Sequence, residues 1–256
     1  MIANYHTHTA RCHHAQGEDI EYVQTAIHQD LKILGFSDHA PYLFDSTYYS
    51  TFRMLPEQLE EYVSSISSLK EKYKDEIEIH IGFETEYYPK HFDKLINYLA
   101  CNGIEYIIMG QHFTDNEYDG CKVSTPTKDK SFLMKYCKQI SDGLQTGKFT
   151  YIAHPDMIRF IGDGKTYKAC MREICRTAKA SNTPLELNLL GIRKKRNYPN
   201  PLFWEVAAEE DNQVILGCDA HSPDEVANSR DISAAISFLK QYNIKPIDTV
   251  TLKKLR

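Results

Sequence analysis

The chain has 256 residues, of which 42% are hydrophobic and 25% are charged. This composition is typical of a globular protein with a hydrophobic core, and it excludes a disordered chain and a coiled coil. The 30 basic and 35 acidic residues give a net charge of −5, which argues against a protein that coats nucleic acid or binds membranes through basic residues. The unusual count is histidine, with 11 residues.

Cysteine usage and the N-terminal sequence predict where the protein is found. The seven cysteines are an odd number without a Cys-x-x-Cys pair, which favours reduced thiols over a disulfide framework. The N-terminal residues lack the apolar stretch of a signal peptide, and no apolar run reaches the roughly 18 residues that a membrane span requires. We therefore expect a cytoplasmic protein without a membrane partner.

Apolar runs and helical patterns alternate along the chain. The apolar runs predict seven strands at residues 2–6, 33–38, 77–83, 106–110, 149–153, 185–189 and 214–218. The helical patterns lie at residues 19–29, 55–73, 91–102, 130–146, 167–181, 201–210 and 231–242. This alternation is typical of βα units around a parallel sheet, and seven evenly spaced strands favour a closed or nearly closed α/β barrel. We expect residues 1–256 to form a single domain.

Histidine and acidic side chains stand at the ends of most predicted strands. They are His6, His8, His39, Glu84, His112, His154, Asp219 and His221, with His14 in the loop after the first strand. The carboxyl ends of barrel strands share one face, so these side chains should converge. Residues two apart on a strand point to the same side, so His6 and His8 can bind one metal ion. Because nine candidate ligands exceed the needs of one ion, the sequence predicts a cluster of two or three metal ions.

The order and spacing of these motifs resemble the polymerase and histidinol phosphatase (PHP) family. The similarity runs from Tyr5-His6-Thr7-His8 to Asp219-Ala220-His221 and so takes in the whole chain. Residues 11–15, 35–42 and 82–87 are similar to the monofunctional histidinol-phosphate phosphatases of that family. The resemblance implies a distorted seven-stranded, TIM-like (β/α)7 barrel with three divalent metal ions.

The resemblance also implies how the ligands divide among the metals. His6, His8, Glu84 and Asp219 would hold the first ion; Glu84 would bridge to a second ion held by His112 and His154; and His14, His39 and His221 would hold the third. Imidazole and carboxylate ligands suit zinc, manganese or iron, and the sequence does not choose among them.

The implied activity is that of a phosphatase in histidine biosynthesis, which hydrolyses L-histidinol phosphate to L-histidinol and phosphate. A hydroxide bridging two metal ions would attack the phosphorus. A proton for the leaving group would come from Asp38 or from a histidine such as His221, although Asp38 is equally suited to supporting an imidazole. No oligomeric state is assigned from the sequence.

Substrate contacts are expected at the same strand ends. Arg159 and Arg193 are candidates for the phosphate, although the basic run at residues 193–196 is equally consistent with a solvated loop. Candidates for the imidazole and ammonium groups are Tyr42, Glu86, Phe113 and Asp115.

Three other functions stay open at this point. A phosphoesterase or exonuclease of the same family would act on another phosphorylated metabolite or on nucleic acid, but the acidic balance offers little of the basic groove that nucleic acid requires. A non-catalytic metal-binding protein would need a closed coordination shell. A metal-dependent amide hydrolase typically carries a bridging lysine, whereas the fourth predicted strand ends in Gln111 and His112.

Overall fold

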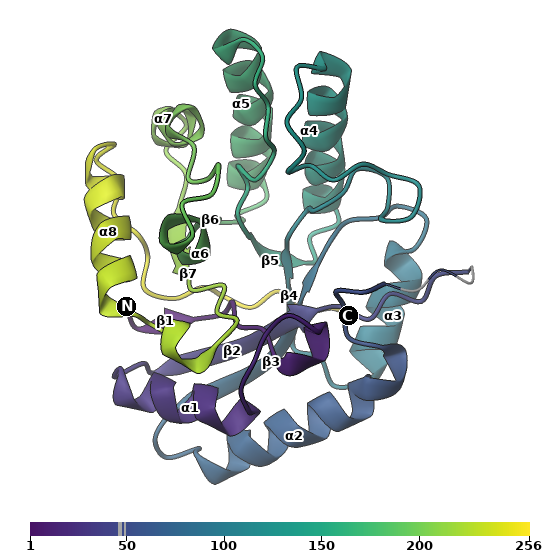
Figure 1. Ribbon diagram of the computed structural model, residues 1–256, viewed down its shortest axis with the longest axis vertical. Helices are drawn as coiled ribbons and strands as arrows, with labels where there is room; N and C mark the ends of the chain where they lie inside the picture. The colour runs from purple at the N-terminus through teal and green to yellow at the C-terminus, as the bar shows by residue number, and fades with distance from the viewer. Residues whose placement is uncertain (46–47, 49) are drawn as a thin grey trace.

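The structure is a computed structural model that describes residues 1–45, 48 and 50–256. In this part of the chain, seven parallel strands follow one another in sequential order in a single sheet, and helices surround the strands (Figure 1). The strands are β1 (Ala3–Asn4), β2 (Ile33–His39), β3 (Glu78–Thr85), β4 (Tyr106–Met109), β5 (Phe149–Ile152), β6 (Leu185–Asn188) and β7 (Val214–Gly217). The predicted seven-stranded α/β barrel is confirmed.

The helices lie between the strands, as the alternation predicts. They are α1 (Asp19–His28), α2 (Leu59–Lys72), α3 (Phe92–Cys101), α4 (Lys130–Gln145), α5 (Gly164–Ala180), α6 (Leu189–Arg193), α7 (Pro201–Glu209) and α8 (Ser229–Lys240), with short 3-10 turns η1 (Ala10–Cys12), η2 (Pro56–Gln58) and η3 (Pro223–Glu225). None of the described helices combines the length and the apolar character needed to cross a membrane.

Helix α6 is the element that the sequence did not predict. The apolar run was expected to stay extended to Leu189, but β6 ends at Asn188. The Asn188 side chain accepts a hydrogen bond from the backbone N–H of Gly191 and so begins the helix. Because the helix begins here, it determines where the basic run at residues 193–196 lies.

The side chain of Tyr106 fills the inside of the barrel. Its hydroxyl donates to the backbone carbonyls of Tyr5, at 2.8 Å, and Phe36, at 3.1 Å. A Cβ atom on Gly35 would lie 2.2 Å from this hydroxyl, and one on Gly82 would lie 2.3 Å from the ring. Glycine at these positions therefore leaves the space through which Tyr106 ties β4 to β1 and β2.

The barrel closes between β1 and β7 through few contacts. Thr7 and Ala220 form an isolated parallel bridge just beyond the two strands, and the backbone N–H of His8 donates to the carbonyl of Ala220 at 2.9 Å. Below this bridge the C-terminal tail packs Ile247, Val250 and Leu252 against an apolar cluster that contains Tyr106. The tail thus covers the end of the barrel opposite the histidines.

Candidate metal centre

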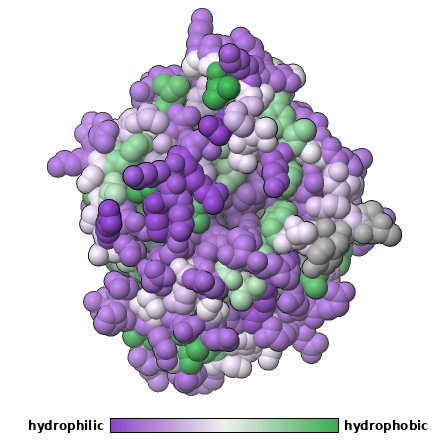
Figure 2. All heavy atoms as spheres, in the orientation of Figure 1, coloured by the Kyte–Doolittle hydropathy of each residue, from purple (hydrophilic) through white to green (hydrophobic). Residues whose placement is uncertain are grey.

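The strand ends surround a cavity of about 690 Å³. Seven of the nine expected ligands line it, namely His8, His14, His39, Glu84, His112, Asp219 and His221. The other two, His6 and His154, are 0% and 1% exposed and contact this group. Figure 2 shows hydrophilic side chains gathered around a hollow near the middle of the face in view. The structure therefore brings all nine side chains together.

Glu84, at the end of β3, lies at the centre of the cluster. Its Oε1 atom is 2.7 Å from Nε2 of His154 and 3.5 Å from Nε2 of His112. Its Oε2 atom faces His6 and His8 at 3.6 and 3.5 Å. A Cβ atom on Gly110 in the neighbouring chain segment would lie 1.8 Å from Oε1, so glycine there leaves room for the carboxylate. Oε2 also lies 3.2 Å from Nδ1 of His39. The two oxygens of one carboxylate thus face different groups of histidines: Oε1 faces His112 and His154, and Oε2 faces His6, His8 and His39.

The remaining ligand candidates form two compact groups. Ligand atoms of His6, His8 and Asp219 lie within 4.8 Å of one another, and so do those of His14, His39 and His221. Asp219 has a backbone φ of +46° and His154 one of +31°, in the left-handed region that non-glycine residues seldom adopt. These two backbone conformations occur just after β7 and β5, and local strain of this kind is found at functional sites.

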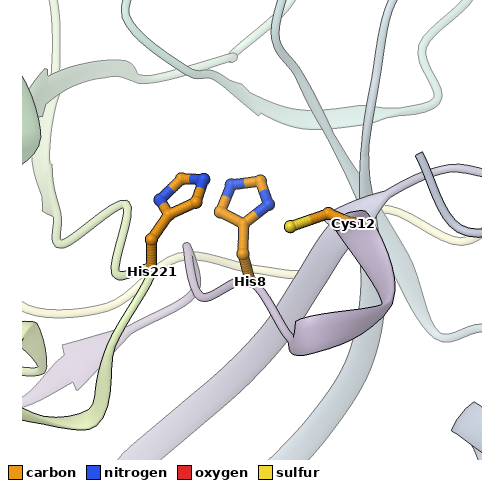
Figure 3. A group of neighbouring side chains, drawn as sticks. All are labelled: His8, Cys12 and His221. Carbon is orange, nitrogen blue, oxygen red and sulfur yellow. The ribbon is translucent and has the colours of Figure 1, made fainter. Parts of the chain in front are cut away.

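Cys12 lies next to the cluster but on the other side of His8. Figure 3 shows one ring nitrogen of His8 directed towards the sulfur of Cys12 and the other towards His221. One ion cannot be bound by both nitrogens of a ring whose lone pairs diverge, although Cys12, His8 and His221 are close enough to be grouped as ligands. We therefore do not count Cys12 as part of the centre.

The charges of the cluster favour a cation. Burial opposes the charged form of His6, but Glu186, Asp219 and Glu84 raise its pKa to about 10. Burial would raise the pKa of Glu84, yet His112, His39 and His6 hold it well below its usual range. The carboxylates are therefore ionised and draw positive charge to this place.

The donor atoms fit divalent metal ions. Within the described residues, Nδ1 of His39 and Nδ1 of His154 are buried without a hydrogen-bond partner. The Nε2 atoms of His6 and His8 face each other at 3.3 Å. Burial and the charge of His8 lower the pKa of His221 to about 3. Once a metal ion replaces the protons on His6 and His8, this set of imidazoles and ionised carboxylates is suited to zinc, manganese or iron.

Two carboxylates that were predicted to act in catalysis or substrate binding, Asp38 and Glu86, lie next to candidate ligand histidines. Asp38 is fully buried, accepts hydrogen bonds from Thr9 and lies 3.5 Å from Nδ1 of His8. Glu86 is 1% exposed, accepts a hydrogen bond from Nδ1 of His112 at 2.8 Å and pairs with Arg53 at 2.8 Å. Because buried partners surround both side chains, neither is among the described residues that line the cavity.

Only some of the residues that were predicted to contact the substrate line the cavity. Phe113 lines the cavity, where its ring stacks on that of Phe52 with centroids 5.9 Å apart. Tyr42 is buried and donates its hydroxyl to the carbonyl of Glu86, while Asp115 pairs with Lys135 at the surface. Neither of these two belongs to the described lining of the cavity.

The two expected phosphate-binding arginines do not reach the cavity. Arg193, at the end of α6, pairs with Glu225 and Asp231 at 2.9 Å each and donates to the carbonyl of Asp219. Arg159 is exposed, and its backbone pairs with Val123 and Thr127. Among the described residues, the cations that line the cavity are instead Lys122, Lys194 and Arg196. Lys194 and Arg196 belong to the basic run that the sequence analysis singled out, whereas no pattern pointed to Lys122.

Comparisons with known proteins agree with this geometry. The family model of the PHP domain matches residues 4–189. The chain belongs to the PHP domain family. A Deinococcus radiodurans protein named "Probable histidinol-phosphatase" is 27% identical over 237 residues, which cover 88% of each chain. A Schizosaccharomyces pombe protein of the same name is 25% identical over 252 residues, covering 88% of this chain and 82% of that protein.

A solved structure shares the fold of this PHP domain protein. Histidinol phosphate phosphatase from Lactococcus lactis, in complex with zinc, L-histidinol and phosphate, has a TM-score of 0.75 to this chain at 20% identity. The match covers 99% of this chain and 97% of the other. The family resemblance seen in the sequence is therefore confirmed.

Proposed function

We propose that this PHP domain protein is a metal-dependent phosphatase that hydrolyses L-histidinol phosphate to L-histidinol and phosphate. The position of Glu84 is the observation that carries the proposal, because its two carboxylate oxygens face separate groups of histidines. A bridging carboxylate is the usual way to hold two cations at the spacing needed for displacement at phosphorus. The relatives named histidinol-phosphatase support the choice of substrate.

We assign the ligands in three groups. The first metal ion takes His6, His8, Glu84 and Asp219; the second takes Glu84, His112 and His154; and the third takes His14, His39 and His221. When bound, divalent cations supply positive charge to the phosphoryl oxygens and make water acidic enough to be a nucleophile near pH 7. His221 acts in this proposal as a metal ligand rather than as a proton donor, because its ligand atom lies with those of His14 and His39.

The side chains around the cavity suit the remaining parts of the substrate. Lys122 and Arg196 line the cavity and can serve a phosphate group as cationic partners. The stacked rings of Phe52 and Phe113 offer an aromatic surface to the imidazole of L-histidinol phosphate. We also propose that the chain forms a single catalytic domain.

A substrate comparison tests the proposal. The purified protein, loaded in turn with zinc, manganese and iron, is assayed for phosphate release from L-histidinol phosphate, an aryl phosphate and a dinucleotide. We expect the highest kcat/KM for L-histidinol phosphate. A preference for the dinucleotide would instead support an exonuclease of the same family, and metal binding without any hydrolysis would support a non-catalytic metal-binding protein.

A further inference from the structure

Strand β6 is the strand that contributes none of the nine candidate ligands, yet its end is polar and buried. Glu186 and Asn188 are 0% and 2% exposed, and both sit in an otherwise apolar strand. Burying a carboxylate and an amide costs free energy unless their hydrogen bonds are made. Their partners therefore indicate what these two side chains do.

Glu186 contacts two candidate ligands from two different strands. Nδ1 of His6 donates to its Oε1 atom at 2.7 Å. The backbone N–H of His154 donates to its Oε2 atom at 2.9 Å. Asn188 donates to the same Oε2 atom at 2.8 Å and also to Oδ2 of Asp219 at 3.0 Å. The pair on β6 therefore holds ligand candidates that follow β1, β5 and β7.

The contact with His6 fixes the direction of the imidazole ring. Because Nδ1 of His6 donates its hydrogen bond to Glu186, Nε2 on the opposite side of the ring is the nitrogen that can offer a lone pair to a metal ion. Nε2 faces Oε2 of Glu84 at 3.6 Å and Oδ1 of Asp219 at 3.7 Å. The ring is thus presented to the cluster through the nitrogen that would bind a metal ion.

Glu186 depends on a histidine for its opposite charge. Within the described residues, its one ion-pair partner is His6, and no lysine or arginine contacts it. Burying a carboxylate without a cation is unfavourable. A metal ion on the other nitrogen of His6 would supply positive charge through the ring in place of a proton.

The neighbouring strand leaves space for this carboxylate. A Cβ atom on Gly217 in β7 would lie 1.7 Å from Oε1 of Glu186. Gly110 stands in the same relation to Glu84, at 1.8 Å. Two buried carboxylates are therefore each accommodated by a glycine on the adjacent segment.

We propose that Glu186, assisted by Asn188, is a positioning residue that orients His6 and sets the affinity of the first metal position. The inference rests on the proposed function, since it takes the nine side chains to be a metal centre. Carboxylates behind metal-binding histidines typically contribute about 10- to 100-fold to metal affinity.

Zinc affinity, measured by competition with a chromophoric chelator, tests the proposal without an enzyme assay. Glu186→Gln keeps the size of the side chain but removes its charge, and we expect it to weaken binding of one zinc equivalent by about 10- to 100-fold. With cobalt in place of zinc, the visible absorption of that equivalent should change as well. The matched control is Asp156→Asn, because Asp156 is also a buried carboxylate but contacts the N–H groups of Asn200 and Trp204. The control should bind zinc as the wild type does.

A second variant distinguishes weaker metal binding from loss of the folded structure. Gly217→Ala leaves Glu186 in place but pushes its carboxylate away from His6, so it should weaken the same zinc equivalent while circular dichroism shows a folded barrel. Wild-type zinc affinity in both folded variants would overturn the inference. Phosphate release from L-histidinol phosphate is measured separately on the wild type, so a failure of the proposed substrate leaves the zinc result interpretable.

Discussion

Oε1 of Glu84 lies 2.7 Å from Nε2 of His154, so a carboxylate at the end of β3 meets an imidazole that follows β5. We predict that Glu84→Gln lowers kcat by at least about 100-fold, because the ligand itself should contribute more than the outer residues that support ligands. It should also lower the bound metal per chain, measured by elemental analysis.

Glu105→Gln is the control for this change. Glu105 precedes β4, is 30% exposed and pairs with Lys70 and His80, away from the cavity. Its substitution should leave the metal content and kcat near their wild-type values. Equal metal content and equal kcat in Glu84→Gln would refute the bridging role.

Two neighbouring arginines are expected to have different effects. Arg196 lines the cavity and is exposed, so Arg196→Met should raise KM for L-histidinol phosphate about 10-fold while the protein stays stable. Arg193 is held by Glu225 and Asp231, so Arg193→Met should mainly lower the free energy of unfolding. Steady-state kinetics and urea denaturation on both variants separate the two roles. A larger KM effect in Arg193→Met would reverse the assignment.

Arg53 is 1% exposed and lies between two buried carboxylates. It pairs with Glu86 at 2.8 Å and with Glu117 at 2.6 Å, which joins the segment before α2 to the loop after β4. Arg53→Met would leave both carboxylates buried without a cation, so we expect it to lower the free energy of unfolding by about 3 to 5 kcal/mol.

Exposed Arg176, which pairs with Glu210, provides the comparison for Arg53. Because Arg176 is 68% exposed, Arg176→Met should cost less than about 1 kcal/mol in urea denaturation. Similar losses for the two variants would mean that the buried network does not stabilise the loops.

The barrel could be predicted from the sequence because each strand is a short apolar run between helical patterns. The error at β6 has a local cause: Leu189 and Leu190 continue the apolar run, but Asn188 ends the strand as a helix cap. The early turn into α6 carries Arg193 to Glu225 and Asp231, while Arg196 reaches the cavity. Nearness to a strand end therefore did not identify which arginine lines the cavity.

The candidate ligands could be predicted because each lies at the end of a strand or in the loop after it, and the barrel brings strand ends to one face. The roles of Glu86 and Glu186 could not, since their partners come from distant segments. Glu86 pairs with Arg53, and Glu186 binds His6, which is 180 residues away in the chain. Glu186 did stand out as an acidic residue between Leu185 and Leu187, which is the signal that could have marked it.

The buried carboxyl group of Asp156 should make stability depend on pH. Burial raises its pKa from 3.8 to about 6, so the folded protein holds this proton more tightly than the unfolded chain. The free energy of unfolding therefore falls as pH rises from about 4 to about 6, by an amount of about 3 kcal/mol. Asp156→Asn cannot ionise, and its stability relative to wild type should rise over the same range. Urea denaturation of both proteins at pH 4 and pH 7 measures this; a difference that does not change with pH would contradict it.

Phosphate release from L-histidinol phosphate, followed as metal is returned to metal-depleted protein, is the most direct test of the central claim that the histidine cluster is a catalytic metal centre. The depleted protein should be inactive, and activity should rise in proportion to bound zinc, manganese or iron until the nine ligands are occupied. Full activity in the metal-depleted protein would contradict the claim.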